Sequence, residues 1–362
     1  MPMMINHSSS SVLPKDFSFI KNLSQRNFVG KGTYCNKFRE KLSHTTGRCE
    51  CILTNNGSEA LQISLYVLRT MNPKCKNVAV SGYVCPTVVS AIYREGLKPL
   101  FLDVLPDSMG ISMESAHDRI DESTLALICT NTGGFPDEYS KTQKLPCPVI
   151  SDCAQAIGSK FNGRSITEYG LVTILSFGPT KMLTAGTGGA LLIDDRNMYE
   201  LAMKYSAGEM DVEYYMRNGF LTTFGQHFSD LNAGLGLSQL KRFESFILKR
   251  RSIAQKYTDV LRSNGEVNLP SHSLDATPNF YRYYFFSDQA NQWLDFLRYG
   301  GVDARSSISH NMSEYFPHSD QMPNLIKNSN RIISLPIYPS FSRGEINKVV
   351  KMLQKGLDSG LR

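Results

Sequence analysis

The 362-residue chain lacks any apolar stretch long enough to cross a membrane. Runs such as Leu125–Cys129 are much shorter than the roughly 20 residues that a spanning helix needs. Met1–Lys15 contains a serine cluster, but it has neither the basic segment nor the apolar core of a signal peptide. These absences predict a cytoplasmic protein that has no membrane partner.

Concentrated charge of one sign is also absent. Lys and Arg number 39 and Asp and Glu number 33, which gives a net charge of +6, and no segment gathers this excess into a basic run. We therefore expect no nucleic-acid partner, whereas a small molecule that carries phosphate needs only a few local cations.

The sequence has no recognisable metal-binding or disulfide pattern. Its eight cysteines are scattered, and only Cys49 and Cys51 lie close together, in a predicted strand that would place both thiols on one face. No second close cysteine pair and no HxxxH pattern completes a ligand set. We expect no metal site, and reduced cysteines in the core.

What the sequence does contain is an alternation of short apolar runs with helical patterns. The length is typical of about two domains. Strands are predicted at residues 49–53, 77–81, 99–104, 125–130, 149–152 and 171–177, with helices at 58–70 and 86–95. Strands that alternate with helices are typical of βαβ units, so we predict an α/β fold with a large, mostly parallel sheet covered on both faces.

The chain divides into three predicted parts. Residues 1–35 are expected to form a polar, irregular arm, residues 36–229 the large α/β domain, and residues 230–362 a smaller α+β domain. The last part contains a long helical pattern from 229 to 261, strands at 282–287 and 301–305, and helices at 292–299 and 343–357. This mixed order favours a domain that packs beside the large one.

Three segments place chemically useful groups at the ends of predicted strands. Asp152 ends one strand, at the edge where open α/β sheets bind their ligands. Gly57 and Ser58 open a helix directly after another strand, so its N–H groups can hold an anion. Lys181 lies on a loop between a strand and the glycine-rich turn 186–189, where a desolvated lysine can act as a nucleophile.

Each segment alone has a simpler interpretation. Asp152 can be a helix cap, Lys181 a solvated surface charge, and residues 54–61 a capping box without a ligand. Together, however, they supply what pyridoxal 5'-phosphate (PLP) needs: a helix N-terminus for its phosphate, a carboxylate for its ring nitrogen and a lysine for its aldehyde. The glycine patterns of dinucleotide and ATP sites are missing, which disfavours a nicotinamide-dependent dehydrogenase.

These motifs resemble those of the DegT/StrS-type sugar aminotransferases, which are PLP enzymes of the aspartate aminotransferase (type I) fold. The resemblance extends from about residue 30 to the C-terminal helix. The segments that carry it are 54–61, Asp152-Cys153-Ala154-Gln155, Ser176-Phe177-Gly178-Pro179-Thr180-Lys181, 186–190, 231–240 and Ser334-Leu335-Pro336.

The resemblance implies a role for each matched residue. Lys181 would capture the cofactor aldehyde and later move a proton. Asp152 would pair with the ring nitrogen, and Gln155 would lie beside the phenolic oxygen. The residues implied to hold the phosphate are Gly57, Ser58 and Ser176.

Three departures from the family pattern concern the surroundings of the cofactor. Cys85 occupies the position of the usual ring-stacking aromatic residue, with Tyr83 as an alternative. Gln226 or His227 would replace the asparagine that reaches the phosphate from the neighbouring subunit. Residues 131–136 lack the family's usual histidine and tyrosine, which affects substrate identity.

The resemblance also implies a reaction and an assembly. L-glutamate would donate its amino group, leaving 2-oxoglutarate, and a keto sugar nucleotide would accept it, in a homodimer. Arg305 and Lys204 are candidates for the diphosphate, although ordinary surface charge is the simpler interpretation of both. Two alternatives remain open: transamination of a keto-cyclitol or another non-nucleotide acceptor, and a non-catalytic binding or regulatory protein that keeps the fold.

Overall fold

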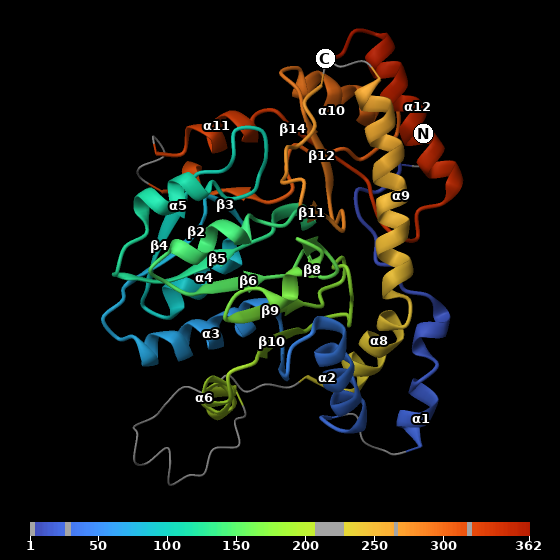
Figure 1. Cartoon of the computed structure of the whole chain (residues 1–362). Coiled ribbons are helices and arrows are strands. Elements are labelled where there is room, and N and C mark those ends of the chain that lie inside the picture. Colours follow the sequence, from blue (N-terminus) through green and yellow to red (C-terminus); the bar gives the residue numbers. More distant parts are fainter. Residues whose placement is uncertain (1–3, 26–29, 207–227, 264–266, 317–320) are drawn as a thin grey trace.

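A seven-stranded sheet forms the centre of the molecule (Figure 1), in a computed structural model that describes residues 4–25, 30–206, 228–263, 267–316 and 321–362. Its strand order is β1-β10-β9-β6-β5-β2-β4. The strands are β1 (Glu50–Thr54), β2 (Asn77–Ser81), β4 (Lys98–Leu102), β5 (Thr124–Cys129), β6 (Val149–Asp152), β9 (Val172–Ser176) and β10 (Gly189–Ile193). Strands β4, β2, β5, β6 and β9 pair in parallel, whereas β10 pairs antiparallel with both β9 and β1. The predicted, mostly parallel α/β sheet is confirmed.

The strands bury both faces because their side chains alternate between two apolar cores. Ile150 and Ile174 belong to one core, and their neighbours Val149 and Leu175 belong to the other. The first core is completed by α3 (Gly57–Met71), α4 (Pro86–Arg94) and α6 (Arg196–Ser206). The second core is completed by α2 (Thr33–Thr46) and α5 (Met113–Arg119).

The C-terminal part builds a third core around a two-stranded antiparallel pair, β12 (Tyr283–Phe286) and β14 (Ile332–Leu335). Helices α9 (Phe243–Arg262), α10 (Ala290–Tyr299) and α12 (Arg343–Asp358) pack on this pair. Figure 1 shows the long α9 running from the region of α2 and α8 (Asp230–Leu240) up to this layer. The domain boundary at residue 230 remains a prediction.

Short pairings connect the two parts of the chain. The strand β3 (Tyr83–Val84) pairs with β13 (His310–Asn311), and β7 (Lys160–Phe161) pairs with both β8 (Arg164–Ser165) and β11 (Ala276–Thr277). The helix α11 (Pro323–Ser329) follows β13 in the chain and lies near α5 and β4 in Figure 1. The C-terminal part is therefore joined to the large sheet region at two separate places.

Two expectations for the C-terminal part are wrong. The helical pattern at 229–261 forms two helices, because the chain breaks at Arg242, whose guanidinium pairs with Asp16 at 2.5 Å. Residues 301–305 form no strand. Val302 makes only a single bridge with Ile5, and the Ala304 N–H turns back to the Val302 carbonyl.

The N-terminal arm is more ordered than its polar composition suggests. It contains a 3-10 turn at Pro14–Phe17 and the short helix α1 (Ile20–Ser24), and α2 already begins at Thr33. The fully buried Asp16 accepts hydrogen bonds from Gln239 and Arg242. These contacts anchor the arm to the junction between α8 and α9.

The expectation that Cys49 and Cys51 share one face is wrong. Strand β1 begins at Glu50, so Cys49 lies outside it and is exposed, whereas Cys51 is buried. The N–H of Cys49 donates to the Asp194 carboxylate instead of to a neighbouring strand. All eight cysteines are free thiols.

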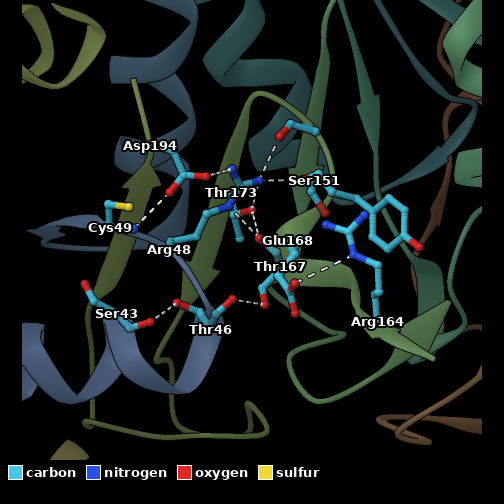
Figure 2. Close-up of polar contacts among 12 residues, drawn as sticks. Ser43, Thr46, Arg48, Cys49, Ser151, Arg164, Thr167, Glu168, Thr173 and Asp194 are labelled. Atoms are coloured by element: carbon cyan, nitrogen blue, oxygen red, sulfur yellow. Dashed lines mark hydrogen bonds and ion pairs between the residues drawn. The ribbon is translucent and has the colours of Figure 1, made fainter. Parts of the chain in front are cut away.

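A buried arginine connects the amino ends of β1 and β9, as Figure 2 shows. The Arg48 guanidinium donates to the carbonyls of Thr167, Tyr169 and Gly170 at 2.6–2.8 Å and pairs with Asp194 at 2.6 Å. Its side chain is 4% exposed. One side chain therefore satisfies three carbonyls and a carboxylate.

We expect the substitution Arg48→Met to lower the free energy of unfolding by about 3 kcal/mol, because it leaves these buried acceptors without a donor. Urea denaturation would measure the change. The matched control is Arg196→Met, since Arg196 pairs with Glu50 and Glu200 on the exposed surface and should contribute less than about 1 kcal/mol. Equal losses in the two variants would contradict the structural role of Arg48.

Candidate active site

Three strand ends meet at one edge of the sheet, opposite the Arg48 network. Strands β1, β6 and β9 run in the same direction, so their carboxyl ends lie at this edge, where α/β sheets bind ligands. A pocket of about 200 Å³ opens there. Seven of the predicted cofactor residues line it: Gly57, Ser58, Cys85, Asp152, Gln155, Ser176 and Lys181. The eighth, Gln226, lies outside the described residues, as does His227.

One end of the pocket is the N-terminus of α3. The Asn56 side chain caps this helix by accepting the Glu59 N–H at 2.9 Å. The N–H groups of Gly57 and Ser58 belong to the first turn and have no partner within the helix. A Cβ at Gly57 would lie 3.0 Å from the Ser176 Cβ, so glycine permits the close approach of α3 to the end of β9. The two serine hydroxyls and the helix N-terminus together suit an anion such as phosphate.

Asp152 supplies a buried carboxylate at the end of β6. Its Oδ1 accepts the Ala154 N–H at 2.9 Å, and within the described ranges no donor contacts its other carboxylate oxygen. Burial raises the pKa of this carboxyl, while the positive charge of Lys181 acts in the opposite direction. Asp152 therefore presents one oxygen that is available to a ligand in the pocket.

Lys181 enters the same pocket from the loop after β9. Its N–H donates to the Gly178 carbonyl at 3.1 Å, which forms a tight turn, and its Nζ lies 5.5 Å from the ring centre of Tyr281. Farther along the loop, the Ala185 carbonyl accepts a hydrogen bond from Asn232 of α8. Hydrogen bonds therefore hold the loop both at Lys181 itself and at Ala185.

Gln155 is held by the turn that follows β5. Its Oε1 accepts the Gly133 N–H at 2.8 Å, and its backbone carbonyl accepts from Asn279. Gly134 has a φ of +90°, and a Cβ there would overlap the Asn279 side chain. Residues 131–136 therefore serve to position Gln155, and Thr132 of this segment lines the pocket itself.

The pocket wall where a stacking residue is expected contains both Tyr83 and Cys85. The Tyr83 hydroxyl accepts the N–H groups of Ile308 and Ser309 at 3.0 and 3.2 Å, which fixes the phenol against a C-terminal loop. Burial raises the pKa of Tyr83 to about 12. Cys85 is half-buried, with its Sγ 3.2 Å from the Thr87 hydroxyl. Which of the two contacts a cofactor ring remains a prediction.

The two candidate cations for a diphosphate lie outside the pocket lining. Lys204 is exposed on α6, and Arg305 is exposed and pairs with Asp303 at 3.0 Å.

Sequence reasoning also missed pocket residues. Thr130 lines the pocket directly after the end of β5, so it could have been predicted, like Asp152, from its position at the end of a strand. Ser309 also lines the pocket, but no pattern in the neighbouring sequence indicates it.

Tyr281 is a further residue that the sequence did not suggest. It is buried behind Lys181, and its hydroxyl accepts a hydrogen bond from Arg282 at 3.3 Å. Burial raises the pKa of this phenol, but the charges of Lys181 and Arg282 and a hydrogen bond with Thr180 outweigh burial, so the net pKa lies below its ordinary value.

The chemistry available to the pocket follows from these groups. It offers a primary amine, a carboxylate with one available oxygen, and an anion-binding helix end. In the part of the chain that the structure describes, no group of three or more His, Cys, Asp or Glu residues is arranged to hold a metal ion. Nor do the described helices include one that is long and apolar enough to span a membrane.

The chain is similar to known aminotransferases over nearly its whole length. Residues 14–354 match the DegT/DnrJ/EryC1/StrS aminotransferase family. The chain is 24% identical to GDP-perosamine synthase of Escherichia coli O157:H7 over 328 residues, which cover 87% of this chain and 88% of the relative.

Solved structures share the fold. The Helicobacter pylori protein PseC, an aminotransferase involved in the biosynthesis of pseudoaminic acid, has a TM-score of 0.88 and 17% identity, with 98% of this chain and 100% of PseC covered. The PLP form of Spr1654 from Streptococcus pneumoniae has a TM-score of 0.87 and 18% identity, with 99% and 100% covered. These likenesses assign the fold of PLP-dependent sugar aminotransferases.

Proposed function

The chain belongs to the DegT/DnrJ/EryC1/StrS aminotransferase family, and from this premise we propose that it uses PLP to transfer an amino group from L-glutamate to a keto sugar nucleotide. The observation that carries the proposal is the convergence of Lys181, Asp152 and the α3 N-terminus on one pocket. A binding or regulatory protein would need no amine beside a buried carboxylate. The reaction turns glutamate into 2-oxoglutarate and the ketone of the acceptor into an amine.

The pocket residues fit PLP. The α3 N-terminus, which Gly57 allows close to Ser176, suits the phosphate, and the available oxygen of Asp152 suits a protonated ring nitrogen. When bound, PLP supplies an aldehyde that takes up amines and a ring that accepts electrons from the reacting carbon.

The residues of the chain then have distinct roles. Lys181 would bind the cofactor aldehyde and would later move a proton. Asp152 would keep the ring nitrogen protonated. Gln155, fixed by the Gly133 N–H, would hold the side of the phenolic oxygen. Ser58 and Ser176 would donate their hydroxyls to the phosphate.

The assignment of a sugar nucleotide as acceptor is supported by the relative whose name includes a GDP-linked product. A non-nucleotide acceptor such as a keto-cyclitol is the second candidate, and one observation favours it. Among the described residues that line the pocket, Lys181 is the only Lys or Arg, so none of them is a cation suited to a diphosphate. A homodimer belongs to the first proposal; Gln226 or His227, which the resemblance implies for the contact with the neighbouring subunit's phosphate, lie outside the described residues.

A half-reaction screen tests the proposal. The purified protein should take up PLP, turn yellow and release 2-oxoglutarate when L-glutamate is added. The resulting amine form is then mixed with keto sugar nucleotides or with keto-cyclitols, and the return of the visible band is followed. Return with the nucleotides supports the main proposal, and return with cyclitols alone assigns the second candidate. A protein that binds no PLP would contradict both.

A further inference from the structure

The segment Asn279–Arg282 crosses from the C-terminal part to the rear of the pocket. Its first residue, Asn279, is fully buried and donates to the carbonyls of Gln155 and Ile157 at 3.0 and 2.9 Å. The Asn279 Oδ1 accepts the Tyr281 N–H at 2.8 Å. This segment is therefore hydrogen-bonded to the loop after β6 that carries Gln155.

Phe280 has a left-handed backbone conformation, with a φ of +53°. Such a conformation is unfavourable for a bulky residue and persists only where surrounding contacts impose it. Arg250 of α9 imposes it here, because its fully buried guanidinium donates to the carbonyls of Phe280, Tyr281 and Ile337 at 3.2, 3.1 and 2.9 Å. The strained turn directs the next side chain, Tyr281, toward the lysine loop.

The Tyr281 ring lies against the Lys181 amine. The Nζ is 5.5 Å from the ring centre, within the range of a cation–π contact. The other charged groups around the ring are cations: the Arg282 guanidinium at 4.4 Å and the Arg250 guanidinium at 5.9 Å from its centre. Asp152 is the acidic group that interacts with Lys181 from the strand side. The Tyr281 ring is thus a shared contact of the Lys181 amine and of two arginines.

We propose that Tyr281 is the positioning residue for Lys181: its ring, held by the Arg250-clamped turn, supports the ammonium form of the amine through a cation–π contact. The inference rests on the proposed function for its significance, since a proton-carrying lysine is what transamination requires. The effect of the Tyr281 ring on the Lys181 amine does not require the cofactor.

The physical effect has a definite direction. The negative face of an aromatic ring stabilises a cation by about 0.5–2 kcal/mol, depending on solvation. Without the ring, the ammonium form loses this support. The reactive, unprotonated amine should then be present at lower pH.

The test uses the full-length, PLP-free protein and labels its amines with acetic anhydride across a pH series. Peptide mass spectrometry quantifies the label at Lys181, with the exposed Lys160 as internal standard. In Tyr281→Leu, the pH of half-maximal labelling at Lys181 should fall by about one unit. Tyr281→Phe keeps the ring and removes only the hydroxyl, so its fall should be smaller than that in Tyr281→Leu.

The matched control is Tyr283→Leu, because Tyr283 is an equally buried tyrosine whose hydroxyl lies 2.9 Å from that of Thr258, in the C-terminal core. This variant should lose stability but keep the labelling profile of Lys181. If Tyr281→Leu does not fold, Tyr281→Met removes the ring with a similar volume but a more flexible side chain, which fills the gap more easily. An unchanged profile in a folded ring-less variant, or an equal shift in Tyr283→Leu, would overturn the inference. Failure to bind PLP would affect only the proposed function.

Discussion

Replacing Lys181 by glutamine should abolish amino transfer and leave the fold intact. Under the proposed function, the variant loses both the amine that would capture the cofactor and the group that would move the proton. Proton transfer alone contributes about 10²–10⁴-fold to rates of this kind, so we expect at least a 10³-fold loss, of the order that such a group supplies. Release of 2-oxoglutarate from L-glutamate measures the effect.

Stability should hardly change in this variant, because Lys181 makes no ion pair with the described residues and is only partly buried. Borohydride reduction gives an independent readout: mass spectrometry of the unmodified protein should find PLP attached to Lys181. The matched control is Lys160→Gln, an exposed lysine of β7, which should keep full activity. Substantial turnover in Lys181→Gln, or an adduct on another lysine, would refute the assignment.

The substitution Asp152→Asn should separate activity from stability. An amide cannot keep the ring nitrogen protonated, so we expect a loss of at least about 10²-fold, comparable with the removal of one preorganised electrostatic partner. The fold should be retained, because an amide oxygen can still accept the Ala154 N–H. The rate of the glutamate half-reaction and the melting temperature are the two measurements.

The direction of the stability change follows from the pKa. Burial raises the pKa of the Asp152 carboxyl, which means that the native state disfavours its charge relative to the unfolded chain. A neutral amide avoids this cost at neutral pH, so the melting temperature should stay constant or rise. Asp194→Asn provides the contrast, because it weakens the Arg48 network and should lower stability without affecting PLP uptake. A strongly destabilised Asp152→Asn would contradict this account.

The sheet was predictable because its strands bury both faces. A continuous apolar run such as residues 125–129 has no polar alternation, and this pattern is typical of parallel strands under two helical layers. The placement of Asp152 and Ser176 at strand ends followed directly, since parallel strands end at a common edge. Lys181 was predictable only in combination with Asp152 and the helix start at Gly57, because a loop lysine alone is usually a surface charge; the family resemblance then matched the same residue.

Other features could not be read from the chain, because distant residues create them. Tyr281 reaches Lys181 only because Arg250 holds the carbonyls beside Phe280, and neither contact has a periodicity or a motif. The break at Arg242 depends in the same way on Asp16, more than 200 positions away in the sequence. The composition of residues 301–305 is typical of a strand. In the structure, however, Val302 and Arg305 each form only an isolated bridge, so no continuous strand pairing develops.

The antiparallel strand β10 has a consequence for synthesis on the ribosome. Strand β1 is the edge strand of the described sheet, and β10 is its only neighbour, with Glu50 opposite Ile193. Because β1 leads directly into α3, the strand that positions the α3 N-terminus has no sheet partner until the chain has been made past residue 193. A nascent chain can therefore assemble β2, β4 and β5 early, but the α3 end of the pocket is fixed only after more than half of the 362 residues have been made.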